Sequence, residues 1–107
     1  MDFGIEKNFD GNCWNVALRG EIDIFNSGSL KTQLTQLMEE HKADMHVNCK
    51  ELEYIDSTGL GALVGVLKHI KSHGKEMHLS NVKPNTLKLF HITNLDKVFI
   101  VEGDKNE

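Results

Sequence analysis

The 107 residues of this chain are enough for one domain with a modest core, since 39% of them are hydrophobic. The formal net charge is −4, and Arg19 is the one arginine among twelve basic residues, which excludes the clustered basic surface of a nucleic-acid-binding protein. No apolar run is long enough to span a membrane, and the N-terminal M-D-F-G-I-E-K lacks the pattern of a secretory signal. Cys13 and Cys49 match no metal or redox spacing. We therefore expect one domain over residues 1–107 of a cytoplasmic protein with reduced thiols, no membrane segment and no direct contact with nucleic acid.

The first half of the chain predicts two strands, a helix and a third strand. Apolar residues in 3–9 and alternation in 13–18 flank a turn at 10–12, which is typical of a hairpin. Residues 19–25 are interpreted as a loop that leaves the sheet. A helix is expected over 29–42, capped by Asn26 or Ser27, because apolar residues recur there at helical spacing. The clear alternation of residues 45–49 predicts the third strand.

The second half continues the alternation of helices and strands. Residues 50–53 are interpreted as a connection, followed by a helix over 57–72 that Gly74 ends. A short strand around Met77 and Leu79 leads to a third helix, with Pro84 in its first turn and inward-facing residues Leu87, Leu89 and Phe90. A break at residues 93–95 precedes a last strand at 98–101 and a polar tail, 103–107, that we expect to fray. This order predicts an α/β fold whose mixed, largely parallel sheet has an N-terminal hairpin and crossover helices.

The most informative stretch is Y-I-D-S-T-G-L-G-A-L-V-G at residues 54–65. Asp56 is a natural N-cap of the helix that follows, because its carboxylate can accept from an amide one or two residues on. Ser57 would be the first helical residue, with its hydroxyl near the positive end of the helix dipole. Sites in parallel sheets form where loops leave the carboxyl ends of strands. The loops at 20–27 and 52–59 both qualify, so Asp23 and Ser57 would lie close together if their strands are neighbours.

Three glycines, Gly59, Gly61 and Gly65, interrupt this helix, and each costs about 1 kcal/mol relative to alanine. Their spacing matches neither the dinucleotide-binding fingerprint nor a P-loop. Gly61 and Gly65 share one helix face, so either close packing or a flat surface for a partner explains them. Asp23 also has two interpretations, as a turn-forming residue or as a carboxylate that contacts a partner.

The residues give little support to catalysis, and we expect a protein that is not an enzyme and has no cofactor. A hydrolase nucleophile elbow around Ser57 would need glycine at position 55, where Ile55 stands. His69 and His73 lie one helical turn apart, but the sequence offers no third ligand, so we interpret them as part of a solvated face and predict no metal site.

Two stretches, G-E-I-D-I-F-N-S-G-S-L at residues 20–30 and Y-I-D-S-T-G-L-G at residues 54–61, resemble the signatures of STAS-domain anti-sigma-factor antagonists of the general-stress and sporulation type. The length and the order of elements agree, so the resemblance covers nearly the whole chain. It implies binding to an anti-sigma factor that is also a serine kinase, phosphorylation of Ser57 by that kinase, and reversal by a PP2C-type phosphatase. It also implies a partner surface, which we expect to include Asp23, Asp56, Thr58, Gly59, Leu60 and Gly61.

Other functions stay open at this point. A module that binds a nucleotide or another small ligand at the same helix N-terminus is one alternative, and a stressosome-type scaffold subunit is another. We expect a monomer or a weak dimer. The sequence leaves undecided whether Leu60, Gly61 and Val64 belong to the core or to an interface, and which sigma factor is controlled.

Overall fold

The computed structural model describes residues 3–95 and 99–103, and over these residues the chain folds around a five-stranded sheet. The sheet order is β1-β2-β3-β4-β5. β1 (Phe3–Phe9) is antiparallel to β2 (Cys13–Ile22), and β3 (Asp44–Ile55), β4 (Met77–Val82) and β5 (Ile100–Gly103) continue the sheet in parallel. The predicted α/β fold, with its N-terminal hairpin and largely parallel sheet, is therefore confirmed.

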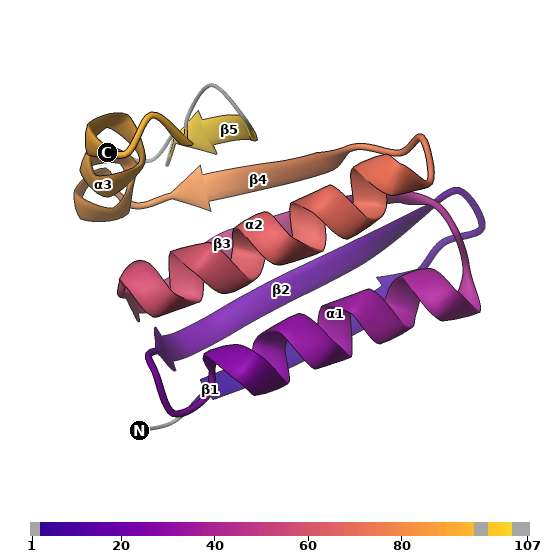
Figure 1. The fold of residues 1–107 in the computed structure, drawn as a ribbon, viewed down its shortest axis with the longest axis horizontal. Helices are drawn as coiled ribbons and strands as arrows, with labels where there is room; N and C mark the ends of the chain where they lie inside the picture. Colours follow the sequence, from indigo (N-terminus) through magenta and orange to yellow (C-terminus); the bar gives the residue numbers. More distant parts are fainter. Residues whose placement is uncertain (1–2, 96–98, 104–107) are drawn as a thin grey trace.

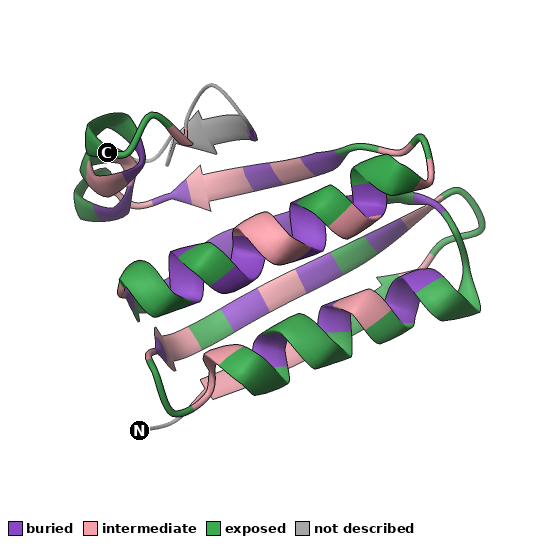
Figure 2. Ribbon diagram, in the orientation of Figure 1, coloured by how far each residue is buried: buried purple, intermediate pink, exposed green. Residues whose placement is uncertain are grey.

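The helices are α1 (Ser27–Glu40), α2 (Ser57–Ser72) and α3 (Pro84–Ile92). α1 and α2 lie side by side across one face of the sheet, and α3 follows the end of β4 (Figure 1). Their buried residues form stripes toward the sheet, while their outer faces are exposed (Figure 2). None of the helices within the described ranges has both the length and the hydrophobicity that crossing a membrane requires.

Buried and exposed side chains alternate along the strands, and this explains why the helices cover one face of the sheet. In β2, Trp14, Val16 and Leu18 are buried, whereas Asn15 and Arg19 between and beyond them are exposed. The core joins the buried strand residues to the helix stripes, and its large, fully buried members are Leu18, Ile22, Leu30, Leu34, Leu37, Met38, Met45, Leu63, Leu67, Ile70, Met77 and Phe90. The opposite face of the sheet carries mainly polar side chains, among them Glu6, Asn8, Asn15, His46, Asn48 and Ser80.

β2 and β3 are longer than the sequence predicted, and this corrects two expectations. Residues 19–22 belong to β2 and residues 50–55 to β3, so neither stretch is a loop. The register pairs Glu21 with Tyr54 and Ile22 with Ile55, after a shift beside Gly20. The register skips Glu53, so the extra residue of this bulge lies in β3. Gly20 on the opposite strand has φ +87°, a left-handed conformation that glycine adopts without strain.

Other boundaries differ by a few residues. α1 begins and ends two residues earlier than predicted, and the bounds of α2 are confirmed. Asn26, one of the two expected caps, is at the N-cap position, but its side chain bonds the Asp23 N–H and the Glu21 carbonyl and does not cap the helix. Gly74 has φ +74° after α2, and Asn94 has φ +61° at the predicted break after α3. The last strand is Ile100–Gly103 rather than 98–101. Val98 and residues 104–107 of the expected tail lie outside the described residues, whereas residue 103 is paired in β5.

Candidate functional site

The candidate site lies at the carboxyl ends of β2 and β3. These parallel strands end opposite each other, because Ile22 pairs with Ile55. The Asp56 N–H then donates a hydrogen bond of 3.2 Å to the Ile22 carbonyl. Asp23, the next residue after β2, therefore lies beside the connection from β3 to α2, which carries Asp56 and Ser57. The sequence predicted this neighbourhood on the condition that the two strands are neighbours, and β2 and β3 meet that condition.

Asp56 caps α2 as predicted. Its Oδ1 accepts from the N–H groups of Thr58 and Gly59, each at 3.0 Å, and from the Thr58 hydroxyl at 2.5 Å. The hydrogen bond from the Thr58 side chain, followed by the one from the Gly59 N–H, lowers the pKa of Asp56. The carboxylate is thus ionised at neutral pH, and the Thr58 hydroxyl beside it is occupied.

Ser57 is the first residue of α2 and is exposed. Its hydroxyl makes no hydrogen bond within the parts of the chain that the structure describes, in contrast to that of Thr58. The helix dipole favours a negative charge at this end, while the Thr58 and Gly59 amides already bond the Asp56 carboxylate. Ser57 therefore presents a free hydroxyl where an added anion would be tolerated.

Asp23 shapes the loop between β2 and α1. Its Oδ1 accepts from the Phe25 N–H at 2.9 Å, and its own N–H donates to Asn26 Oδ1 at 2.9 Å. The Asp23 carbonyl accepts from the N–H groups of Asn26 and Ser27. Asp23 thus has the turn-forming role, and its contact with a partner stays a prediction.

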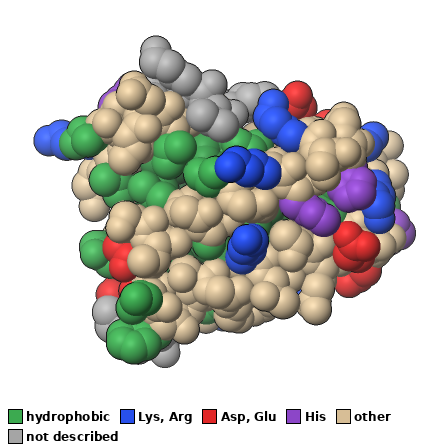
Figure 3. All heavy atoms as spheres, in the orientation of Figure 1, with side chains coloured by type: hydrophobic (Ala, Val, Ile, Leu, Met, Phe, Trp, Pro, Cys, Tyr) green, Lys and Arg blue, Asp and Glu red, His purple; other side chains and the backbone are tan. Residues whose placement is uncertain are grey.

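This loop exposes two large apolar side chains that the sequence analysis did not select. Phe25 is 92% exposed and Ile24 67%, and Tyr54 at the end of β3 is 48% exposed. Hydrophobic side chains gather at the end of the molecule where α1 and α2 begin (Figure 3). The signal in the sequence is the Ile-Phe pair directly before the polar residues that start α1. The pair falls within residues 19–25, which the sequence predicts to be a loop that leaves the sheet. We name Ile24, Phe25 and Tyr54 the apolar rim of the site.

A groove adjoins the apolar rim between the end of β3 and α3. Its volume is about 250 Å³, and Tyr54, Ile55, Thr86, Leu89 and Ile92 contribute to its walls. Ile92 is itself 71% exposed. The apolar surface at this end therefore extends from the loop before α1 to the outer side of α3.

The glycines of α2 differ in their surroundings. A Cβ on Gly59 would lie 2.6 Å from Ile55 Cγ1 and 2.8 Å from Ile22 Cγ2, so Gly59 permits close packing of the helix on the strand ends. A Cβ on Gly65 would meet the flexible side chain of Lys31, and one on Gly61 would meet nothing within 4 Å. Close packing thus explains Gly59, and Gly61 leaves an open, flat position on the helix surface.

Leu60, Gly61 and Val64, which the sequence did not assign to the core or to an interface, differ in how far they are buried. Leu60 is 3% exposed and belongs to the core, so its side chain is not on the surface where we expected partner contacts. Gly61 is exposed and Val64 is half-buried. Among the expected partner-binding residues, the exposed positions are Thr58 and Gly61, and Asp23 and Asp56 are half-buried.

The chain belongs to the STAS domain family, whose model matches residues 4–107. It is 33% identical over 108 residues to the anti-sigma-B factor antagonist of Staphylococcus aureus, with 100% of both chains covered.

Two solved proteins share the fold. An anti-sigma factor antagonist from Mycobacterium paratuberculosis has a TM-score of 0.83 at 19% identity, over 94% of this chain and 86% of that one. The Bacillus cell fate determinant SpoIIAA in its phosphorylated form has a TM-score of 0.71 at 17% identity, over 92% of this chain and 90% of that one. The unphosphorylated form of SpoIIAA has a TM-score of 0.68 at 18% identity, with coverages of 91% and 97%. At these identities the likeness shows the fold alone.

Proposed function

We propose that this protein is a cytoplasmic anti-anti-sigma factor that phosphorylation at Ser57 switches off. In its unphosphorylated form it binds an anti-sigma factor with serine kinase activity and so releases a sigma factor for transcription. A PP2C-type phosphatase restores the active form. The full-length similarity to a protein named anti-sigma-B factor antagonist supports the role. The observation that carries the switch is the Ser57 hydroxyl, which is exposed near the apolar rim and has no hydrogen bond to any residue that the structure describes.

The hydrogen bonds favour Ser57 over Thr58 as the phosphate acceptor. A kinase needs a hydroxyl that can reach the γ-phosphate, and the Thr58 hydroxyl donates to the capping carboxylate of Asp56. Phosphorylating Thr58 would break that bond and place a dianion against Asp56. Phosphorylating Ser57 leaves the cap intact, because Asp56 keeps the Thr58 and Gly59 amides.

Burying the side chains of the apolar rim against a protein partner is more favourable than leaving them in water. Exposed aromatic side chains of this kind are enriched among the residues that dominate interface energetics. Phe25, at 92% exposure, contributes little to the folded chain by itself and can bury most of its surface against a partner. We place the partner surface over the apolar rim, Ser57 and the open position at Gly61.

Phosphorylation would change this surface more than the fold. It adds a charge of about −1.5 to −2 at neutral pH. The helix N-terminus stabilises such a charge by about 0.3–1 kcal/mol, so the domain stays folded. The partner surface, in contrast, would receive a dianion next to the carboxylates of Asp23 and Asp56, and the complex would separate. The solved SpoIIAA structures in both phosphorylation states share the fold of this chain, which supports the first part of the proposal, that the domain stays folded.

The test compares Ser57→Asp with a charge control at the same end of the molecule. Ser29→Asp is that control, because Ser29 is exposed in the first turn of α1. We expect the free energy of unfolding of both variants, measured in urea, to lie within about 0.5 kcal/mol of the wild-type value. Only Ser57→Asp should weaken binding to the anti-sigma kinase, by about tenfold or more, which is 1.4 kcal/mol. Unfolding of Ser57→Asp would contradict a switch that acts on the surface, and unchanged binding would contradict a switch at Ser57.

A further inference from the structure

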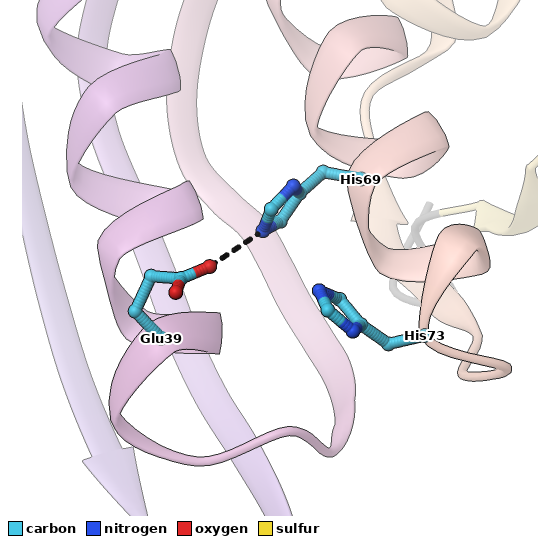
Figure 4. Close-up of side chains that lie close together, drawn as sticks. All are labelled: Glu39, His69 and His73. Carbon is cyan, nitrogen blue, oxygen red and sulfur yellow. Dashed lines mark hydrogen bonds and ion pairs between the residues drawn. The ribbon is translucent and has the colours of Figure 1, made fainter.

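A second cluster of chemically active side chains lies at the other end of α1 and α2. Glu39 of α1, His69 of α2 and His73, the C-cap residue directly after α2, each place one possible ligand atom within 4.8 Å of the others (Figure 4). Among the residues that the structure describes, this is the one cluster of three or more such side chains. We propose that these three residues bind a divalent transition-metal ion, with Zn²⁺ as the best fit, and that the ion links α1 to α2.

The fold explains how residues 30 positions apart meet. α1 and α2 each follow a parallel strand, so they run in the same direction and their last turns lie at the same end of the sheet (Figure 1). His69 lies in the last turn of α2 and His73 is the C-cap residue that follows, and their rings meet with centroids 5.0 Å apart. Both rings are turned toward α1, where Glu39 occupies the last turn (Figure 4).

The distances suit a tetrahedral ion. Bonds of about 2.0–2.1 Å to nitrogen and oxygen place neighbouring ligand atoms about 3.3–3.4 Å apart. Glu39 Oε2 and His69 Nε2 are 3.2 Å apart, so this pair already has the required spacing. The His69 and His73 rings meet edge to face with centroids 5.0 Å apart, and a ligand nitrogen of His73 lies within 4.8 Å of the other two ligand atoms, so it would have to approach them further to bind the same ion.

The donor types and their exposure also fit. Two imidazoles and one carboxylate form a known zinc ligand set that leaves a fourth position for water. The Glu39 side chain is 62% exposed and that of His69 31%, so an ion can enter from solvent. Lys42 lies 4.0 Å from the other Glu39 oxygen, Oε1, and leaves Oε2 directed at His69.

A simple hydrogen bond between helices explains only part of the cluster. Glu39 and His69 satisfy each other without His73, whose ring makes no hydrogen bond within the described part of the chain. The site is also separate from Ser57, because the 12 helical residues from Ser57 to His69 correspond to about 18 Å along α2. Metal binding would therefore leave the proposed phosphorylation site accessible, and the two proposals can fail independently.

The experiment titrates tag-free, metal-stripped protein with Zn²⁺ at neutral pH by calorimetry, and with Co²⁺ by its visible spectrum. We expect one ion per chain and the absorption of tetrahedral Co²⁺. His69→Ala, His73→Ala and Glu39→Gln should each weaken binding by about 10- to 100-fold or more, since even second-shell losses cost that much. Zn²⁺ at 100 times its Kd should also shift the folding equilibrium of the wild type about 100-fold toward the native state.

His46→Ala is the matched control. His46 and His78 are stacked on neighbouring strands with ring centroids 5.6 Å apart, but no third ligand accompanies them in the described ranges. We expect its Zn²⁺ affinity to equal that of the wild type. Binding that persists in His73→Ala, that falls equally in His46→Ala, or that has no defined stoichiometry would overturn the proposal. So would a native chain that binds no Zn²⁺ in calorimetry.

Discussion

Two glycines of α2, Gly59 and Gly61, should respond in opposite ways to the same substitution. They are two residues apart, and alanine at either position removes the conformational freedom that makes glycine unfavourable in a helix. At Gly61 the added methyl meets nothing within 4 Å. Gly61→Ala should therefore stabilise the domain by up to about 1 kcal/mol.

At Gly59 the methyl meets two buried isoleucines. Its distances to Ile55 Cγ1 and Ile22 Cγ2 would be 2.6 and 2.8 Å, far below van der Waals contact. β-Branched side chains held in strands cannot easily rotate away. Overpacking of this kind costs about 1–3 kcal/mol. After the helix-propensity gain of about 1 kcal/mol, Gly59→Ala should destabilise the domain by about 0–2 kcal/mol.

The difference between the two variants isolates the steric cost, because the propensity gain is common to both. Urea unfolding with a shared m-value measures that difference directly, and we expect about 1–3 kcal/mol. For a chain of this length, a change of 1 kcal/mol in the free energy of unfolding shifts the Tm by about 4–5 °C. Equal stability of the two variants would refute the close approach at Gly59. A destabilised Gly61→Ala would refute the exposed position at Gly61.

Three further predictions concern the acid, thiol and surface groups. Hydrogen bonds from the Cys13 and Asn12 amides and the Asn15 side chain lower the pKa of Asp10 from 3.8 to about 2. Asp10 therefore contributes stability above pH 3.8 that is lost as the pH falls toward 2. In Asp10→Asn, the urea midpoint should depend less on pH across that range than it does in the wild type. Burial raises the pKa of Cys49 to about 12, so a thiol reagent should label only Cys13 in native protein and both thiols in urea, as intact mass will show. Phe25→Ser should change stability by less than about 0.5 kcal/mol and weaken binding to the anti-sigma kinase by about 2 kcal/mol or more; equal binding by calorimetry would place the partner surface elsewhere.

Local chemistry made the start of α2 predictable from the sequence. An aspartate followed by hydroxyl residues and then by apolar residues at helical spacing specifies a cap and a buried stripe without information from the rest of the chain. The cap at Asp56 and the bounds of α2 followed. The same periodicity placed Leu60 in line with Leu63 and Leu67, and the structure agrees with that pattern rather than with the partner contact expected for Leu60.

The ends of β2 and β3 were not predictable in this way. Lys50, Glu51 and Glu53 break the apolar pattern, so residues 50–53 appeared to be a connection. In the fold these side chains are exposed, while the backbone between them stays paired with β2. Strand length there depends on the neighbouring strand, which single-sequence patterns do not report. The apolar rim was missed for the same reason, since the loop that exposes Phe25 exists only once β2 extends to Ile22.

The histidine pair on α2 shows the same limit. The spacing of His69 and His73 is visible in the sequence, but a third donor is not. Glu39 is 30 residues from His69 in the sequence and reaches it only because α1 and α2 pack in the same direction. A metal ligand contributed by a neighbouring helix has no local signature.

The central claim is the phosphorylation switch at Ser57. The direct test incubates the protein with ATP and a candidate anti-sigma kinase from the same genome, and then measures intact mass and maps the modified residue. We predict one added phosphate on Ser57, absent from Ser57→Ala, and loss of the complex after modification. A phosphate on Thr58, or a stable complex with the kinase that never becomes phosphorylated, would contradict the account.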